Sequence, residues 1–391
     1  MDPAKGWRMR VFVIAGEASG DKLGAALMAG LKQLRPDVTF DGVGGPLMQA
    51  EGLVSRFPMD ELSVMGLAEI LPKYRALKAR IRQMADAVLD TRPDILITID
   101  SPDFCLRVAK LVKAASNIRT VHYVAPTVWA WRPGRAAKMA KHIDHVLALF
   151  PFEPPYMQAA GMDCDFVGHP VVAEAVATDA EAAAMGDGTV VLVLPGSRKG
   201  EVGRLADRFG EAVARIAAKV PDARFVIPTT GGVHDLVQEK VAGWSVAVTV
   251  LPPGSPDKAA WFKRADVALA ASGTVSLELA ANGTPMVIAY DMSPLSRFII
   301  GRMLRIDTVT LVNLVSDTRV VPEFIGKACE AEPIADAVLD VLAHPDAQNA
   351  AMALTMERLG QGGEAPGLRA ARAVLQRFEQ ATVDDDKAKR E

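Results

Sequence analysis

Residues 10–21 read RVFVIAGEASGD: an apolar run leads directly into a turn of small residues and then into a helical pattern. A strand, a turn and a helix in this order form the first part of a βαβ unit. Short apolar, β-branched runs alternate with longer helical patterns along most of the chain, which is typical of parallel sheets covered by helices on both faces. We therefore expect an α/β fold made of doubly wound parallel sheets.

The apolar runs fall into two series, which predicts two domains in a chain of 391 residues. The predicted strands are 10–15, 39–43, 95–99, 120–124, 145–149 and 164–167 in the first series, and 190–194, 224–228, 247–251, 267–270 and 286–289 in the second. The Ala-rich, acidic segment 171–188 separates them without a strand-like run of its own. We expect a first domain over 1–172, a second over 173–350, and a C-terminal helix with a charged tail over 351–391. Whether that helix returns to the first domain is left open.

Composition excludes several classes of protein. There are 44 Lys and Arg against 47 Asp and Glu, for a net charge of -3, which argues against a nucleic-acid-binding chain. The 3 cysteines are scattered, so we expect neither a disulfide scaffold nor a structural zinc site, and a reducing cytosol fits best. The apolar run near the N-terminus is too short for a signal peptide or a spanning helix. We expect a soluble protein whose membrane contact, if it has any, is peripheral.

Ligands of open α/β sheets bind outside the carboxyl ends of the strands, so two such domains are expected to face each other across a cleft. The first candidate loop supplies Gly16, Glu17, Ser19, Gly20 and Asp21. It presents backbone N–H groups at a helix N-terminus, but its spacing differs from the dinucleotide fingerprint. A tight turn capped by Ser19 or Asp21 explains it equally well.

Asp100 is the second candidate, at the end of the predicted strand 95–99. Ser101, Pro102 and Asp103 are explained by helix initiation alone, whereas Asp100 precedes the cap. A carboxylate in this place could take a proton from a hydroxyl group. A surface aspartate that accepts hydrogen bonds from loop amides is an equally good interpretation.

Two loops of the second series together predict a nucleoside-diphosphate pocket. In LPGSRKGE, residues 194–201, the small residues Gly196 and Ser197 would let backbone amides approach a phosphate, and Arg198 adds a charged fork. In ASGTVSLE, residues 271–278, a helix N-terminus at Ser272, Gly273 and Thr274 would point at a diphosphate. Glu278 lies one turn further on the same helix face, where a neutral diol such as a ribose is its natural partner.

Other polar and aromatic residues carry weaker signals. Trp129 and Trp131 could stack on a ligand, but core and lid packing is the commoner role. The histidines do not cluster with other ligands, so we predict no metal site and no cofactor. His169 follows a strand near the domain joint, and the structural and functional interpretations are balanced there.

The stretch MGLAEILPKYRALKARIR, residues 65–82, is apolar at helical spacing and rich in cations. Its candidate membrane-contacting residues are Leu67, Ile70, Leu71, Lys73, Tyr74, Arg75 and Leu77. A basic amphipathic segment is typical of an interfacial anchor on anionic lipid, although a helix packed on its own sheet is commoner. Pro72 predicts that the stretch is broken into two pieces.

These motifs together resemble one family, the lipid-A-disaccharide synthases, which are inverting glycosyltransferases with the GT-B fold of two Rossmann-like domains. The resemblance covers nearly the whole chain. It rests on AGEASGD at 15–21, GVGGPLMQAEG at 42–52, LSVMGLAEIL at 62–71, IDSPDF at 99–104, HYVAPTVWAWR at 122–132, FVGHP at 166–170, LPGSRKGEV at 194–202, ASGTVSLE at 271–278 and VNL at 312–314.

The resemblance implies a reaction and a set of roles. Diacylglucosamine would pass from UDP to diacylglucosamine 1-phosphate, without a metal, to give the β-1,6 disaccharide precursor of lipid A. Asp100 falls on the general-base position, and Arg198, Ser272–Thr274, Glu278 and Asn313 fall on donor-binding positions. The loop Gly16–Asp21 would line the cleft, and residues 62–82 resemble the membrane-contacting region, which implies the cytoplasmic face of the inner membrane.

Two other functions compete with this one. A nucleotide-sugar epimerase shares the architecture and the UDP site but needs no acyl acceptor. A non-catalytic, membrane-associated nucleotide-sugar binder would tolerate Asp100→Asn. The sequence leaves acyl-chain preference and oligomeric state open, a homodimer included.

Overall fold

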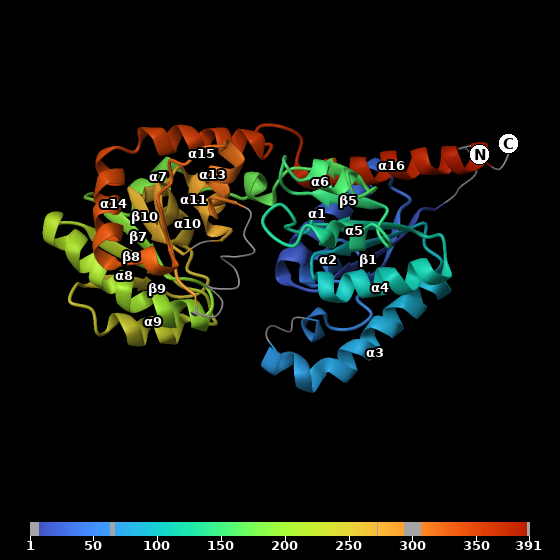
Figure 1. Ribbon diagram of the computed structural model, residues 1–391, viewed down its shortest axis with the longest axis horizontal. Helices are drawn as coiled ribbons and strands as arrows, with labels where there is room; N and C mark the ends of the chain where they lie inside the picture. Colours follow the sequence, from blue (N-terminus) through green and yellow to red (C-terminus); the bar gives the residue numbers. More distant parts are fainter. Residues whose placement is uncertain (1–7, 63–66, 272, 293–305, 389–391) are drawn as a thin grey trace. The chain divides into compact units, whose positions relative to one another are not determined.

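The computed structural model describes residues 8–62, 67–271, 273–292 and 306–388, and within these it describes side chains for 8–62, 75–271, 273–292 and 306–383 (Figure 1). The chain divides into two compact units. The first contains Met1–Pro170 and Gly362–Glu391, and the second contains Val171–Gln361. Each unit is a parallel sheet with helices packed against it, and each is described by itself below.

The sheet of the first unit has the order β2-β1-β3-β4-β5-β6, with every neighbouring pair parallel. Its strands are β1 (Arg10–Ala15), β2 (Thr39–Val43), β3 (Ile95–Ile99), β4 (Arg119–Tyr123), β5 (His145–Ala148) and β6 (Asp163–Phe166). Its helices are α1 (Ala18–Leu34), α2 (Pro46–Ala50), α3 (Leu67–Thr91), α4 (Pro102–Ala115), α5 (Gly134–Met139), α6 (Pro154–Gln158) and α16 (Pro366–Ala388). Because helices cover both faces, β3 is buried along its whole length.

Helix α16 comes last in the chain, yet it packs on α1 of the first unit. Two glycines allow the close approach: a Cβ on Gly30 would lie 2.7 Å from the carbonyl oxygen of Gly367. The two helices therefore touch backbone to backbone, a contact that larger side chains would prevent.

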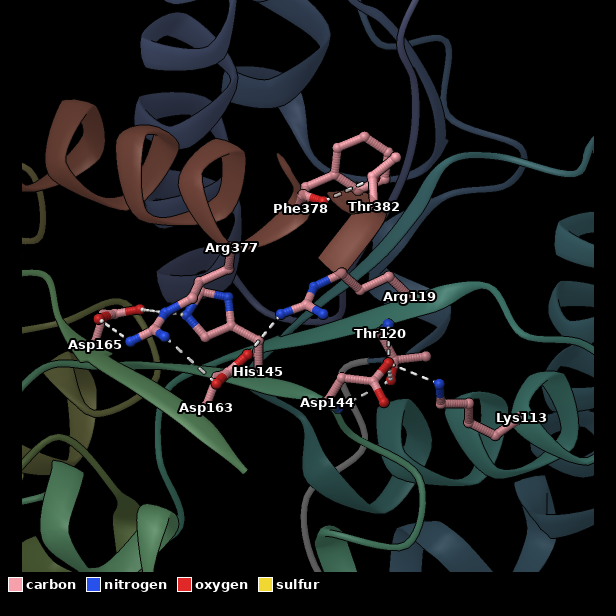
Figure 2. Close-up of polar contacts among 10 residues, drawn as sticks. All are labelled: Lys113, Arg119, Thr120, Asp144, His145, Asp163, Asp165, Arg377, Phe378 and Thr382. Atoms are coloured by element: carbon pink, nitrogen blue, oxygen red, sulfur yellow. Dashed lines mark hydrogen bonds and ion pairs between the residues drawn. The ribbon is translucent and has the colours of Figure 1, made fainter. Parts of the chain in front are cut away.

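An ionic cluster ties α16 to the β5–β6 edge of the sheet (Figure 2). The Arg377 guanidinium donates to both carboxylate oxygens of Asp165, at 2.9 and 3.0 Å, and lies 3.5 Å from Asp163. On the strands, Nε2 of the fully buried His145 lies 2.9 Å from Asp165, and Arg119 donates to Asp163 at 2.7 Å. We call these five side chains the α16 clasp.

The sheet of the second unit has the order β12-β11-β10-β7-β8-β9, again with all pairs parallel. Its strands are β7 (Val190–Leu194), β8 (Arg224–Pro228), β9 (Val248–Leu251), β10 (Val267–Ala270), β11 (Met286–Tyr290) and β12 (Glu323–Ile325). Its helices include α7 (Asp179–Ala183), α8 (Lys199–Lys219), α9 (His234–Val241), α10 (Lys258–Arg264), α11 (Val275–Asn282), α13 (Leu311–Ser316), α14 (Ala331–Ala343) and α15 (Asp346–Arg358). Numbered from β7, the order is 3-2-1-4-5-6, which is that of a Rossmann fold.

The expected α/β fold of two parallel sheets is confirmed, and the predicted strands agree with the observed ones to within one residue at each end. The short edge strand β12 was not predicted. The units meet at Pro170 and Val171, two residues before the expected boundary. Residues 351–361 stay with the second unit, and only Gly362 onward joins the first.

The expected break at Pro72 is wrong, because α3 is one helix over Leu67–Thr91. A proline in the second turn removes a single hydrogen bond close to the helix end, where few bonds depend on it. The remaining turns are held by packing, since Ile81, Met84 and Val88 are buried and α3 lies against α4. No helix in the described part of the chain is long and apolar enough to cross a membrane.

Candidate functional site

In the second unit, the strand order reverses between the parallel neighbours β7 and β10: successive strands are added on one side of β7 up to β9 and on its other side from β10 onward. Helices leave such a pair of strands toward opposite faces, so a crevice opens outside their carboxyl ends. The two loops that the sequence singles out, 194–201 and 271–278, follow these two strands. The topology therefore brings both loops to one crevice.

A cavity of about 430 Å³ lies at this crevice. Of the predicted donor-site residues, the cavity is lined by Gly196, Ser197, Arg198, Gly273, Thr274 and Glu278. It is also lined by Glu201, Pro228, Thr229, Thr230, Lys258 and Phe262, to which the sequence assigned no role. Ser272 lies outside the described residues.

The loop before α8 folds around a carboxylate of its own helix. The Glu201 carboxylate accepts hydrogen bonds from the backbone N–H groups of Ser197 at 3.1 Å and Arg198 at 3.3 Å. Its other oxygen accepts from the Arg198 guanidinium at 3.1 Å. The loop amides that were expected to approach a phosphate therefore have an internal partner.

The loop after β10 ends in the short helix α11, whose N-cap is Thr274. The Thr274 side chain makes no capping hydrogen bond, and Gly273 takes a φ of 141°, in the region that favours glycine. The first N–H groups of a helix have no partner within the helix, and the helix dipole makes this end positive. Thr274 and Val275 line the cavity, so this end is placed to meet an anion there.

Glu278 has a charged partner that the sequence did not suggest. The Lys258 ammonium, from α10, lies 2.6 Å from its Oε1 and 4.9 Å from the ring centre of Phe262. The pair lies at the cavity wall, where the ammonium fixes the carboxylate and offsets its charge. One carboxylate oxygen of Glu278 remains beyond this ion pair and can accept hydrogen bonds.

Asn313 does not line the cavity. Its side chain is 1% exposed, in α13, and both polar ends have protein partners: Oδ1 accepts from the Val321 N–H at 3.0 Å, and Nδ2 donates to the Val321 carbonyl at 3.0 Å. The resemblance implies that Asn313 binds the donor, but its side-chain amide is occupied by these hydrogen bonds within the protein.

In the first unit, the strand order reverses between the parallel neighbours β1 and β3, and these strands carry the other two candidate loops. Asp100 follows β3 with a φ of 52°, and Ser101 has a φ of 41°. Two successive non-glycine residues in the left-handed region are strained, and such strain concentrates at functional sites. Ser19 from the β1 loop is 3.5 Å from Asp100 Oδ2, so the two loops meet at this carboxylate.

Gly16 in the β1 loop makes room for the Asp100 turn. A Cβ on Gly16 would lie 2.6 Å from Ser101 Oγ, whereas one on Gly20 would meet the Ile99 carbonyl at 3.5 Å, an ordinary van der Waals contact. Glu17, half-buried, is the N-cap residue of α1, in place of the expected Ser19 or Asp21. Ser101 caps α4 through its backbone and not through its hydroxyl group, contrary to expectation, because its left-handed φ changes the direction of the side chain.

Asp21 is 3% exposed and has a structural role. Its carboxylate accepts from the backbone N–H groups of Gly45 at 2.9 Å, Leu47 at 3.0 Å and Met48 at 3.0 Å. These donors begin α2, so Asp21 caps that helix from a distant part of the chain. No oxygen of this carboxylate is left without a protein partner.

His169 packs with an aromatic cluster at the end of β5. Its ring lies 5.4 Å from that of Phe150, and Trp129 lies 5.1 Å from Phe152. Beneath the cluster, Glu153 is 2% exposed and accepts from Trp129 Nε1 at 3.2 Å. Burial raises the pKa of Glu153 to about 7, against the opposing effect of the N–H groups that it accepts. This arrangement is the packing role expected for Trp129.

The cationic helix α3 is only partly described. The side chains of Leu67, Ile70, Leu71, Lys73 and Tyr74 lie outside the described residues. Arg75 is exposed and Leu77 is half-buried. Arg80 has an acidic partner, since Glu61 lies 2.7 Å from its guanidinium.

Among the described residues, no group of three or more His, Cys, Asp or Glu side chains is placed to hold a metal ion. A profile of the lipid-A-disaccharide synthetase family matches residues 11–375. A lipid-A-disaccharide synthase of Ruegeria pomeroyi is 64% identical in an alignment 383 residues long that covers 95% of this chain and 96% of that one. A lipid-A-disaccharide synthase of Rhodospirillum centenum is 46% identical in an alignment 387 residues long that covers 96% of each chain.

The chain belongs to the lipid-A-disaccharide synthase family.

Membership in the lipid-A-disaccharide synthase family makes the chain a glycosyltransferase of lipid A biosynthesis, with a UDP-sugar donor and a sugar acceptor. Solved structures agree on the fold. A UDP-GlcNAc 2-epimerase from Neisseria meningitidis bound to UDP-GlcNAc matches with a TM-score of 0.61 at 13% identity, over 95% of this chain and 100% of that one. MurG from Acinetobacter baumannii matches with a TM-score of 0.51 at 13% identity, over 96% and 100%. The two-domain GT-B architecture is thereby confirmed.

Of the six lining residues without a predicted role, Glu201 and Lys258 form ion pairs with the predicted site residues Arg198 and Glu278. Glu201 lies within the motif LPGSRKGE, and its capping-box spacing from Arg198 was the available signal. Lys258 offered none, because it reaches Glu278 from a helix 20 residues earlier in the chain.

Proposed function

We propose that this enzyme transfers 2,3-diacylglucosamine from its UDP-activated form to 2,3-diacylglucosamine 1-phosphate, with inversion and without a metal ion. The products would be the β-1,6-linked tetraacyl disaccharide 1-phosphate and UDP. Family membership supports the reaction class. The observation that carries the site assignment is the cavity at the β7–β10 crevice, lined by a guanidinium and by the start of α11.

Breaking the anomeric C–O bond leaves negative charge on the departing UDP. In the proposed mechanism Arg198 and the N-terminal amides of α11 meet this charge, as preorganised donors do in other enzymes. Glu278, fixed by Lys258, would accept hydrogen bonds from the ribose hydroxyls. Ser197, Gly196 and Gly273 would shape the wall.

Asp100 would remove the proton from the acceptor 6-hydroxyl as it attacks the anomeric carbon. A single displacement of this kind inverts that carbon. The strained turn at 100–101 and the contact from Ser19 support this role, because both fix the direction of the carboxylate. The Gly16–Gly20 loop and His169 would contact the acceptor.

We further propose peripheral contact with anionic lipid through residues 67–77, on the cytoplasmic face of the inner membrane, by a monomer or a homodimer. The exposed cations Arg75, within this stretch, and Lys78, directly after it, support contact with anionic lipid. Acyl chains of both substrates would stay near the lipid while the sugars react.

The test is to incubate the purified protein with both acylated substrates, with and without a chelator. Disaccharide formation that survives chelation is expected, whereas loss of product on chelation, with recovery on adding a divalent ion, would contradict the metal-free mechanism. Asp100→Ala should abolish turnover and leave UDP affinity nearly unchanged. Arg198→Ala should weaken donor binding and turnover together.

A further inference from the structure

Glu201, at the start of α8, holds the very groups that a phosphate-binding loop would offer to its ligand. One of its oxygens accepts from the N–H groups of Ser197 and Arg198, and the other accepts from the Arg198 guanidinium. Its side chain is one-tenth exposed, while that of Arg198 is two-thirds exposed at the cavity. The Glu201 carboxylate is thus buried beneath the loop, and the Arg198 guanidinium lies on the exposed side, toward the cavity.

The backbone is shaped to this carboxylate. Gly196 takes a φ of 120°, and a Cβ at this position would lie 2.6 Å from both Cβ and Oε2 of Glu201. Only a glycine lets the loop close so tightly over the side chain. Both amides consequently point at Glu201, and a diphosphate in the cavity would not find them free.

Charge sets a second condition. A carboxylate next to a diphosphate repels it, unless the carboxylate is already neutralised by hydrogen bonds and by a cation. A guanidinium has five N–H donors, and the hydrogen bond to Glu201 comes from Nη1, so the other edge of the guanidinium can face a phosphate. Fixing a long side chain beforehand also lowers the entropy lost when the ligand binds.

We propose that Glu201 is a positioning residue for the UDP-sugar donor. It presets the Arg198 guanidinium over the cavity and takes up the two loop amides, so that the diphosphate is held by Arg198 and by the start of α11 instead of by this loop's backbone. The inference rests on the proposed donor-binding role of Arg198.

The experiment measures UDP affinity by titration calorimetry for the full chain and its variants. Glu201→Gln keeps an oxygen for the loop amides but turns an NH₂ group toward the guanidinium, so Arg198 is released. We expect affinity to fall by about tenfold. Glu211→Gln, an exposed change of the same kind on the same helix, is the matched control and should leave affinity unchanged.

A double-mutant cycle separates positioning from general damage to the loop. In the Arg198→Ala background, Glu201→Gln should change UDP affinity by less than about twofold, because no guanidinium is left to position. Glu201→Asp, which keeps the charge but is too short to reach amides and guanidinium together, should lose affinity severalfold. Glu201→Asp replaces Glu201→Gln in the experiment if the Gln variant does not fold.

The outcomes are distinct. Unchanged or tighter UDP binding by Glu201→Gln overturns the inference, since it would mean that Glu201 only repels the ligand. An equal loss of affinity in the Arg198→Ala background also overturns it, because Glu201 would then act on the loop and not through Arg198. If the unmutated protein does not bind UDP, or if Arg198→Ala binds it normally, the proposed donor site itself is wrong.

Discussion

The side-chain amide of Asn313 pairs with the backbone of Val321 in both directions, accepting from its N–H and donating to its carbonyl, each at 3.0 Å. The amide thereby imitates one rung of a β-ladder inside the second unit. The same Nδ2 also donates to Thr308 at 3.2 Å. The Asn313 side chain therefore holds the segment that leads into β12.

Asn313→Ala should lower the free energy of unfolding by about 2–3 kcal/mol, because it leaves a buried N–H and a buried carbonyl unpaired. Asn313→Asp should be no better, since it places an oxygen against the Val321 carbonyl. Urea unfolding followed by circular dichroism measures both. If Asn313→Ala keeps full stability yet loses UDP affinity, the side chain is a direct ligand of the donor.

Asp21→Ala should cost about 2–4 kcal/mol of stability, because three backbone donors at the start of α2 lose their shared acceptor in a buried place. Asp21→Asn should cost less, since its remaining oxygen still accepts. Thermal unfolding gives the comparison. A variant of native stability that is catalytically dead would instead place this carboxylate in the acceptor site.

The α16 clasp should depend on pH through Asp165. Burial raises the pKa of this carboxyl, but the hydrogen bonds from His145 and Arg377 outweigh burial and hold the pKa below its ordinary value. A carboxyl with a depressed pKa stabilises the fold above its unfolded pKa, near 4, and loses that contribution as the pH falls further.

Asp165→Asn should therefore lower stability by about 1–2 kcal/mol at pH 7, with a penalty that shrinks steadily below about pH 4. The exposed Asp86→Asn, in the interior of α3, is the matched control in the same unit. The measurement is the melting temperature of both variants between neutral and acid pH. A penalty that stays constant with pH would show that Asp165 acts by shape and not by charge.

Reversing the charge of Arg75 and Lys78 should weaken binding to vesicles of anionic lipid, by about 1 kcal/mol or more for each residue. Neutral vesicles should show no such difference, and high salt should weaken the unmutated protein in the same way. Reversal of the exposed Lys138 and Lys141, elsewhere in the first unit, is the control. If the Arg75/Lys78 variant binds anionic vesicles as well as the Lys138/Lys141 variant in a sedimentation assay, α3 is ruled out as the membrane contact.

The strands could be predicted because each is a short apolar run between turn residues, and the burial of β3 and β7 on both faces explains their continuous hydrophobicity. The edge strand β12 could not, since its three residues are half-buried and pair on one side only. An edge strand needs no apolar pattern, because one side of it faces solvent.

The candidate loops could be found because they follow strands, but the partners of their side chains could not. Asp21 bonds to amides 24–27 residues away, and Glu278 meets Lys258 from another helix. Such pairs depend on tertiary packing, and the local spacing of residues in the sequence does not predict them. Only Glu201, three residues after Arg198, lay within reach of a local pattern.

Residues 362–391 belong to the first unit, whose other residues end at Pro170, which makes the second unit an insertion within the first. A recombinant fragment spanning 171–361 would carry its own sheet complete. No continuous fragment that omits those residues holds all of the first. Truncation just before α16 should therefore expose the apolar side of α1 and cause aggregation, although the nucleotide pocket lies wholly upstream of the cut.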